Sequence, residues 1–334
     1  MKSGSLKRIS SAGIYFLTGV LSVAAIWVLF NRSTTAEKEE KAYRDAFRKH
    51  YAIYALKTPE QLTFAGEDVP VHLLDVAERL DRELLINTYW QSQTMLFLKR
   101  SHKWFGIIEP ILQEEGIPED FKYLPLAESG LMNIVSPAGA AGPWQFLPKT
   151  GRTFGLEVND EVDERYHLEK ATRAACAYLH LAKEQLGSWT LAAASYNMGL
   201  ERTRTRLEQQ QVNNYYDLLL NSETSRYVFR IIALREILEH PRNYGFIARE
   251  QDLYDRVETY EVPVEVPISN LATFARENGI NYRVLKSLNP WLRKRSLQRV
   301  AGKEYRISLP DSAAIPTLIA DTTALTGSRE RSGN

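Results

Sequence analysis

The sequence predicts a mainly α-helical protein that carries a small α+β module at its C-terminus. Apolar residues recur at helical spacing from Val71 to Leu112, three or four positions apart. The segments 168–186 and 189–198 also have helical patterns, and each ends directly before a glycine, which is typical of a helix C-terminus. After residue 250 the pattern changes, because residues 260–266 alternate between apolar and polar side chains as a strand does.

The composition is that of an ordinary globular protein with room for about two domains. The chain has 334 residues, of which 44% are hydrophobic and 25% charged, and its formal net charge is +1. A charge this close to zero, without a dense run of Lys and Arg, argues against nucleic-acid binding. The single cysteine, Cys176, excludes an intramolecular disulfide, and no two histidines have the spacing of metal ligands. We therefore expect no metal, no other cofactor and no nucleic-acid partner.

The N-terminus, residues 1–32, has the pattern of a membrane anchor. Three basic residues precede an uncharged, mostly apolar run over residues 12–30. As a helix this run would span about 28 Å, close to the thickness of the hydrocarbon core. The basic flank is expected to stay in the cytoplasm, so that the rest of the chain crosses the membrane. The small residues Ser22, Ala24 and Ala25 leave a cleaved signal peptide as the alternative.

Residues 33–79 are predicted to form a charged helical stalk or spacer, and residues 80–248 a helical domain. Within this domain Gly116 is expected to end one helix, and Pro118 to stand near the start of the next. Acidic residues follow Pro118, where the helix dipole favours them. Residues 136–143 are mostly small and predict a loop whose backbone can approach a ligand closely.

Glu128 is the best candidate for a catalytic acid. It lies in the apolar segment 123–131, which is predicted to be helical. Burial disfavours the charged form of a carboxyl group and raises its pKa toward neutrality. A glutamic acid with such a pKa can protonate a glycosidic oxygen at neutral pH. No second carboxylate is close to it in sequence, and Asp160, Asp163 and Glu164 have the pattern of a solvated, charged loop.

Four short segments of this domain stand in the order and at the spacing of one known set of motifs. Residues 128–129 read Glu-Ser, and residues 142–150 match a Gly-x-x-Gln-x-x-Pro-x-Thr loop. Residues 195–199 read Ser-Tyr-Asn-Met-Gly, close to Ala-Tyr-Asn-Ala-Gly, and residues 223–227 match Glu-Thr-x-x-Tyr. Together they resemble the lysozyme-like lytic transglycosylases, most closely the membrane-bound D type, over about residues 85–245.

This resemblance implies a lysozyme-like (goose-type/soluble lytic transglycosylase) catalytic domain that acts on peptidoglycan glycan strands. As in the family, Glu128 would protonate the β-1,4 bond between N-acetylmuramic acid and N-acetylglucosamine. It would then accept the proton of the muramic C6 hydroxyl, leaving a 1,6-anhydromuramic end. One glutamate suffices because the nucleophile belongs to the substrate and its attack is intramolecular. The substrate-binding residues implied by the resemblance are Ser129, Gln145, Tyr196, Asn197, Glu223 and Tyr227.

Residues 255–311 resemble a LysM module, because their predicted order is strand, helix, helix, strand. A glycan-binding module and a degenerate module that only packs on the catalytic domain both fit this pattern. Residues 312–334, rich in Ser, Thr, Ala and Gly, are predicted to be disordered. Together with the predicted anchor, the resemblance implies a protein held on the inner membrane with its catalytic domain in the periplasm of a Gram-negative bacterium. No feature of the sequence identifies a protein partner.

Two other functions stay open. A muramidase-type or chitinase-type hydrolase would admit water and would be favoured by a carboxylate facing Glu128 across the cleft. A non-catalytic peptidoglycan-binding scaffold would be favoured by a freely exposed Glu128.

Overall fold

The computed structural model describes residues 37–42, 44–45, 53–298 and 302–320 of the chain. The predicted anchor, residues 1–32, therefore lies outside the described residues. The first two of the described segments are helical. Among the described residues, no helix combines the length and the apolar character needed to cross a membrane.

The chain divides into two compact units, and the second, residues 56–334, begins with a β-hairpin. Strands β1 (Leu62–Phe64) and β2 (Glu67–Val69) pair antiparallel. Phe64 and Val69 lie in the main hydrophobic core. The spacer predicted at residues 33–79 thus ends too late, because its last part folds with the helical domain. Strands this short in a turn-rich segment leave no periodic signal in the sequence.

The carboxylate of Glu67 on β2 caps the N-terminus of α7 (Trp189–Met198). It accepts hydrogen bonds from the backbone N–H groups of Trp189 (2.6 Å) and Thr190 (2.9 Å), and from the hydroxyl of Ser188 (2.7 Å). Burial alone would raise the pKa of Glu67, but the hydrogen bonds from Thr190, Ser188 and Trp189 outweigh it and lower the pKa to about 2. The cap therefore joins the hairpin to the helical domain through a charged acceptor.

We expect Glu67→Gln to lower the free energy of unfolding by about 2 kcal/mol at neutral pH, because the amide keeps the shape of the side chain but loses its charge. Since the folded-state pKa is lowered from 4.5 to about 2, the stabilisation is complete above pH 4.5 and is lost as the pH falls toward 2. Chemical denaturation should show the difference from wild type shrinking over that interval. Glu78→Gln, at an exposed position of α2 (Leu74–Tyr89), is the matched control. Equal effects of the two substitutions would contradict the cap.

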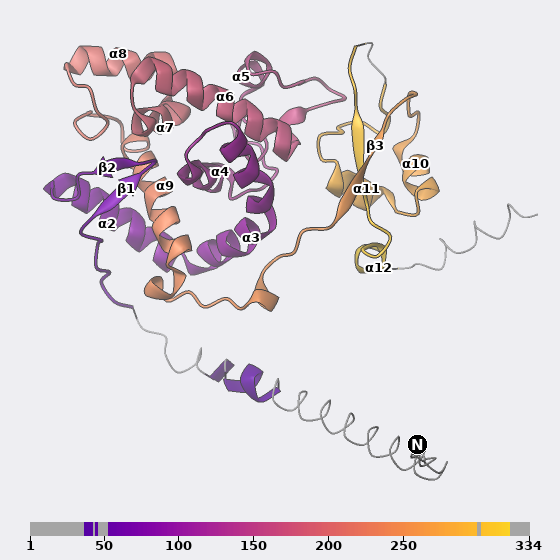
Figure 1. Ribbon diagram of the computed structural model, residues 1–334, viewed down its shortest axis with the longest axis horizontal. Helices are drawn as coiled ribbons and strands as arrows, with labels where there is room; N and C mark the ends of the chain where they lie inside the picture. Colours follow the sequence, from indigo (N-terminus) through magenta and orange to yellow (C-terminus); the bar gives the residue numbers. More distant parts are fainter. Residues whose placement is uncertain (1–36, 43, 46–52, 299–301, 321–334) are drawn as a thin grey trace, which may run out of the picture. The chain divides into compact units, whose positions relative to one another are not determined.

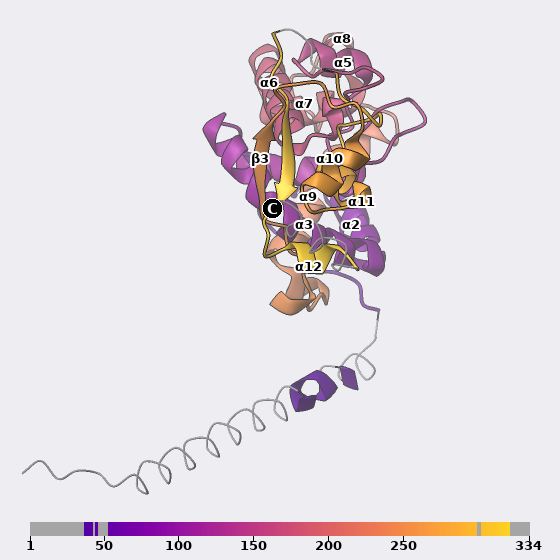
Figure 2. The same cartoon turned by 90° about the vertical axis from the view of Figure 1, so that its right-hand side faces the viewer.

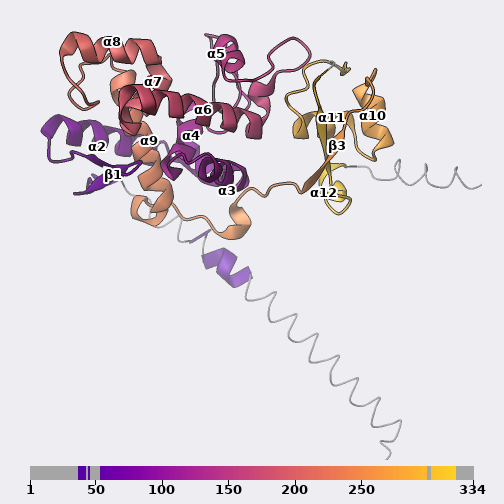
Figure 3. The ribbon, with the colours of Figure 1, turned by 45° about the horizontal axis from the view of Figure 1, so that its top comes forward.

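Helices from α2 to α9 surround the main hydrophobic core, which confirms the predicted mainly α-helical fold class. The short helix α4 lies at the centre of this arrangement, with α3, α6 and α9 around it (Figures 1 and 3). The remaining helices of this domain are α3 (Gln91–Glu114), α4 (Leu124–Ser129), α5 (Pro148–Thr153), α6 (Leu168–Leu186), α8 (Leu200–Gln210) and α9 (Thr224–Glu239), with 3-10 turns at Glu119–Tyr123, Glu164–Tyr166, Pro241–Tyr244 and Glu250–Asp252.

The ends of α6 and α7 are those that the sequence predicts. Gly187 follows α6 with a φ of 76°, and Gly199 follows α7 with a φ of 90°. Between the two helices, the hydroxyl of Ser188 accepts a hydrogen bond from the backbone of Leu191 and so caps α7 a second time. Gly187 and Gly199 thus end the two helices as the sequence predicts, and Ser188 starts the second.

The C-terminal module has its own hydrophobic core and the predicted order of strand, helix, helix and strand. Strand β3 (Thr259–Pro263) pairs antiparallel with β4 (Arg306–Pro310), and Figure 2 shows this sheet beside α10 (Leu271–Glu277) and α11 (Tyr282–Leu288). Asn270 and Asn281 cap the two helices with their side-chain oxygens.

The predicted disorder of residues 312–334 is wrong for its first part. Helix α12 (Ile315–Leu318) follows β4, and Ile315, Leu318 and Ile319 pack against the core of the module. These three apolar side chains supply the burial that the surrounding small and polar residues lack. Residues 321–334 lie outside the described part of the chain.

Candidate active site

Glu128 is partly buried near the C-terminal end of α4, which Gly130 ends in the left-handed conformation with a φ of 63°. Burial raises the pKa of Glu128 to about 7. A hydrogen bond from Tyr227 and the positive charge of Arg230 oppose this shift, and the negative charge of Glu223 adds to it. The carboxyl group is therefore able both to give and to take a proton near neutral pH, as the sequence predicts for a general acid.

Two phenols lie next to Glu128. Tyr227 on α9, a residue that is 2% exposed, donates a hydrogen bond to Oε1 of Glu128. Tyr196 on α7 donates to the backbone carbonyl of Trp144 at 2.8 Å and packs edge to face on Phe146. Burial, assisted by the negative charge of Glu128, raises the pKa of both phenols well above their usual range. Both phenols are therefore neutral donors at the pH where Glu128 titrates.

Gln145 lies in a tightly turned loop between two anchoring aromatic residues. Gly142 and Gln145 have positive φ values of 79° and 51°. Nε2 of Gln145 donates to the carbonyls of Ile134 (3.1 Å) and Gly142 (2.8 Å). Trp144 and Phe146, on either side, are buried in the core. Within the described part of the chain Oε1 of Gln145 accepts no hydrogen bond, so this oxygen is available to a ligand.

Ser129 makes its contacts inside the protein, although the sequence predicts a contact with substrate. The residue is 4% exposed, and its hydroxyl donates to the carbonyl of Pro143 at 2.7 Å. The same oxygen accepts from the backbone N–H of Met132 at 3.3 Å. Because its hydrogen-bonding capacity is used in this way, Ser129 fastens the end of α4 to the loop of Gln145. The motif alone cannot tell an inward from an outward hydroxyl.

Asn197 lies on α7, and Glu223 directly precedes α9. Oδ1 of Asn197 accepts a hydrogen bond from the hydroxyl of Thr224 at 2.9 Å, which joins the two helices. Glu223 is exposed and acts on Glu128 through its charge. Of the predicted site residues, the structure thus puts Tyr227 in contact with Glu128 and Glu223 within electrostatic range. Tyr196, Asn197 and Ser129 bond to the protein around it.

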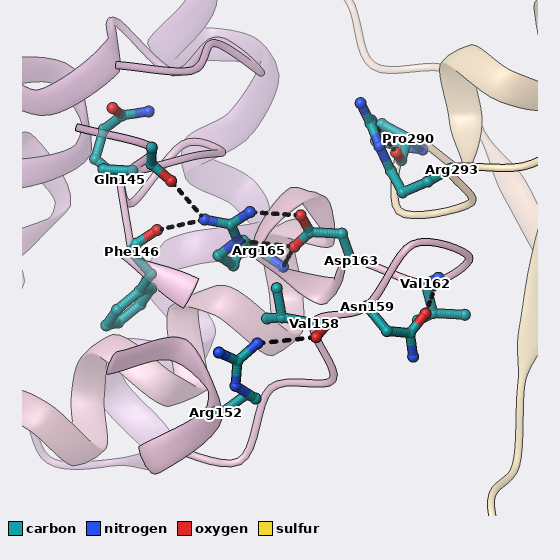
Figure 4. Close-up of polar contacts among 12 residues, drawn as sticks. Gln145, Phe146, Arg152, Val158, Asn159, Val162, Asp163, Arg165, Pro290 and Arg293 are labelled. Carbon is teal, nitrogen blue, oxygen red and sulfur yellow. Dashed lines mark hydrogen bonds and ion pairs between the residues drawn. The ribbon is translucent and has the colours of Figure 1, made fainter. Parts of the chain in front are cut away.

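The sequence failed to predict a buried ion pair behind the loop of Gln145. Arg165, Asp163 and Glu164 are 8%, 6% and 7% exposed, so the prediction of a solvated loop is wrong for both Asp163 and Glu164. Nε and Nη2 of Arg165 donate to the Asp163 carboxylate at 2.9 and 2.7 Å. Nη1 of Arg165 donates to the carbonyls of Gly139 (2.8 Å) and Phe146 (3.0 Å), as Figure 4 shows in part. A carboxylate and a guanidinium two positions apart are the sequence signal that was available.

A second buried charge lies on α2. Glu83 is fully buried and pairs with Arg226 at 2.6 Å and with Arg230 at 3.7 Å, both on α9. Because Arg230 also lowers the pKa of Glu128, Glu83 helps to hold a cation that tunes the candidate acid. A lone glutamate in an amphipathic helix gives no sequence signal for such a role.

Two segments of the chain match known domain families. Residues 107–219 match the transglycosylase SLT domain, and residues 260–313 match the soluble lytic transglycosylase C-terminal LysM-like domain. The first match includes Glu128, Gln145 and Tyr196. The domain content is that of a lytic transglycosylase, which confirms the family resemblance predicted from the sequence.

The chain is also similar in sequence to two curated proteins. The chain is 26% identical over 285 residues to the membrane-bound lytic murein transglycosylase D of two strains of Escherichia coli. The matched region covers 78% of this chain and 61% of each relative. The chain thus spans about three fifths of the length of these relatives.

Two solved structures are similar to part of the chain. An inactive mutant of the lytic transglycosylase Slt from Pseudomonas aeruginosa is 20% identical, with a TM-score of 0.33, over 46% of this chain and 26% of that one. The 70 kDa soluble lytic transglycosylase from Escherichia coli is 21% identical, with a TM-score of 0.37, over 43% of this chain and 26% of that one.

Proposed function

We propose that this chain, which carries a transglycosylase SLT domain followed by a LysM-like domain, is a lytic transglycosylase acting on peptidoglycan. Its scissile bond is the β-1,4 bond between N-acetylmuramic acid and N-acetylglucosamine, and its product carries a 1,6-anhydromuramic end. The observation that carries the proposal is Glu128, a partly buried carboxyl group with a pKa of about 7 beside Tyr227.

In the first step, protonated Glu128 gives its proton to the glycosidic oxygen while the bond from that oxygen to C1 of the muramic sugar breaks. A pKa of about 7 suits this step, because a large share of the molecules hold the proton at neutral pH and the acid is still strong enough to release it. The carboxylate that remains faces the positive charge developing on the sugar ring, and it stabilises that charge in a poorly solvated site.

In the second step, the carboxylate of Glu128 takes the proton of the muramic C6 hydroxyl while the oxygen of that hydroxyl bonds to C1. Glu128 ends protonated, as it began, and no water is consumed. The nucleophile is held next to C1 by the sugar itself, so most of the entropic cost of bringing the two together is already met. The hydrogen bond from Tyr227 stabilises the carboxylate between the two steps.

We assign roles to the remaining predicted site residues from their hydrogen-bonding atoms, which are either free to bind substrate or already bonded within the protein. Oε1 of Gln145 is suited to accept the N–H of an acetamido group. Glu223 is exposed, so its carboxylate is suited to accept hydrogen bonds from sugar hydroxyls. Tyr196 and Ser129 support the loop of Gln145, because their hydroxyl groups bond to the backbone carbonyls of Trp144 and Pro143.

Hydrolysis is the second candidate, and the position of Glu223 favours it. The charge of Glu223 acts on Glu128, so this exposed carboxylate is the candidate for the second carboxyl group that hydrolysis would need. The scaffold function has less support, because Glu128 is partly buried and has a raised pKa rather than being freely exposed.

We further propose that residues 12–30 anchor the protein in the inner membrane with its catalytic domain in the periplasm. The support is the apolar run itself and the membrane-bound description of the relatives. Fractionation of cells expressing the full-length chain tests this location: alkaline carbonate should fail to extract the protein from membranes, and extraction would contradict the anchor.

Mass spectrometry of the fragments released from purified peptidoglycan by the full-length protein in detergent tests the reaction. We expect muropeptides with anhydromuramic ends, each lighter by one water molecule than the corresponding reducing-end product. Reducing ends would establish hydrolysis instead, and the absence of any released fragment would favour the scaffold.

Tyr227→Phe should move the alkaline limb of the pH profile of kcat/KM to higher pH. The hydrogen bond from Tyr227 lowers the pKa of Glu128, so its removal raises that pKa and keeps the acid protonated to higher pH. Initial rates of anhydromuropeptide release, measured from about pH 5 to about pH 9, give the pH profile and its shift. Tyr244→Phe removes a phenol that donates to Glu236 elsewhere in the domain, and its profile should match wild type. A shift to lower pH in Tyr227→Phe would contradict the assignment.

A further inference from the structure

The loop that carries Gln145 depends on Arg165 for its shape. Arg165 donates to carbonyl oxygens at both ends of the loop, on Gly139 and Phe146. Gly142 also lies so close to the backbone carbonyl of Arg165 that a Cβ atom at position 142 would be 1.8 Å from that oxygen. Two hydrogen bonds, shown in Figure 4, and one close backbone approach thus tie the loop that presents Gln145 to Arg165.

Arg165 is in turn held by Asp163, and the backbone of Asp163 is held by the C-terminal module. Asp163 makes two side-chain hydrogen bonds to the guanidinium of Arg165. Its N–H donates to the carbonyl of Trp291 at 2.9 Å, and the N–H of Arg293 donates to the carbonyl of Glu161 at 2.8 Å. Residues 161–163 and 291–293 thus pair like two short antiparallel strands, with Val162 opposite Leu292.

Apolar contacts also join the C-terminal module to the loop of Gln145 and to residues 162–166. Ala141, Val162 and Tyr166 belong to the hydrophobic core of the C-terminal module rather than to that of the helical domain. The guanidinium of Arg293 lies over the ring of Tyr166 at 4.1 Å from its centroid. Ala141 is inside the loop that carries Gln145, so the core of the module reaches the loop directly as well as through Arg165.

Glu157 adds a charged contact between the same two parts. Its carboxylate pairs with Lys303 at 2.6 Å and accepts from the hydroxyl of Tyr305 at 3.1 Å. A module that only tethered the enzyme to glycan would need a linker, not paired backbones and a shared core.

We infer that the C-terminal module is a support of the active site, and that Arg165 and Asp163 are positioning residues that transmit its position to the loop of Gln145. Neither residue is a catalytic residue, because both act behind the loop. The functional part of this inference rests on the proposed transglycosylase reaction, whereas its structural part does not.

Amide hydrogen exchange of the full-length protein tests the structural part. Amides in the loop 139–146 should exchange about threefold faster in Arg293→Ala, which loses the contact with Tyr166, and at least about tenfold faster in Asp163→Asn, which loses half of the buried ion pair. Arg276→Ala, an exposed arginine of α10, is the matched control and should exchange as wild type. Arg293 is also exposed, so this variant keeps the test decisive if Asp163→Asn does not fold. Unchanged loop exchange in Arg293→Ala would overturn the inference.

A double-mutant cycle tests the functional part. We expect Asp163→Asn to raise KM by about tenfold with a smaller change in kcat, because the loop binds substrate rather than transferring protons. In the Gln145→Ala background the same substitution should have almost no further effect, since both act through one loop. Independent effects that multiply would overturn the positioning role. If the wild-type protein releases no anhydromuropeptide, the proposed function fails, and hydrogen exchange still decides whether the module supports the loop.

Discussion

Glu128→Gln should reduce the release of anhydromuropeptides by about 10³-fold or more, because the amide can neither donate the proton to the leaving oxygen nor accept one from the C6 hydroxyl. The amide has nearly the shape of the acid and can still accept the hydrogen bond from Tyr227, so the fold should not change. Binding to insoluble peptidoglycan should therefore be retained. Initial rates by mass spectrometry and a co-sedimentation assay measure the two properties separately.

Glu223→Gln is the matched control, since it removes a negative charge that acts on Glu128 without removing the acid. The charge of Glu223 raises the pKa of Glu128, so its loss should lower that pKa and reduce activity at neutral pH by less than about tenfold. If Glu223→Gln lost as much activity as Glu128→Gln, and the wild-type protein released reducing-end products, the two carboxylates would work as a hydrolytic pair. Retained release by Glu128→Gln would place the acid elsewhere.

Gly142→Ala should have the largest effect on stability of any change in the candidate site, lowering the free energy of unfolding by about 3 kcal/mol or more. The added Cβ atom would lie 1.8 Å from the carbonyl oxygen of Arg165, and a backbone atom cannot rotate away. The positive φ of 79° adds backbone strain to the clash. Chemical denaturation and the rate of product release measure the loss.

Gly139→Ala separates the two causes. Gly139 also has a positive φ, 81°, but a Cβ atom there would meet nothing within 4 Å. We expect it to cost about 1 kcal/mol, the strain of the left-handed conformation alone. If Gly142→Ala were no worse than Gly139→Ala, the close approach to Arg165 would not constrain the loop.

Local sequence signals predicted those parts of the fold that local interactions determine. The helices that end at Gly187 and Gly199 were predictable, because a glycine with positive φ ends a helix whatever packs on it. The burial of Glu128 was predictable for a similar reason, since it lies within an otherwise apolar helical segment. Its raised pKa follows from that burial.

Contacts between distant parts of the chain were not predictable in this way. Asp163 and Arg165 look like a solvated charged loop until the loop of Gln145 and Trp291 cover them. Phe64 and Glu67 lie in a turn-rich segment, and their roles in the core and at the start of α7 depend on a helix more than 100 positions later. The spacing of apolar residues shows which face of a helix or strand is buried, but it does not show which other element covers that face.

The β1–β2 hairpin sets the shortest polypeptide that we expect to fold as the helical domain. A fragment starting at residue 80 would leave a gap where Phe64 and Val69 fill the core, and it would uncover the first N–H groups of α7. Proteases or genetic deletions can therefore trim the chain up to the neighbourhood of Leu56, where the second compact unit begins, without touching the parts that hold Glu128 in place. The natural point at which to exchange the proposed membrane anchor for another targeting sequence lies before Leu56.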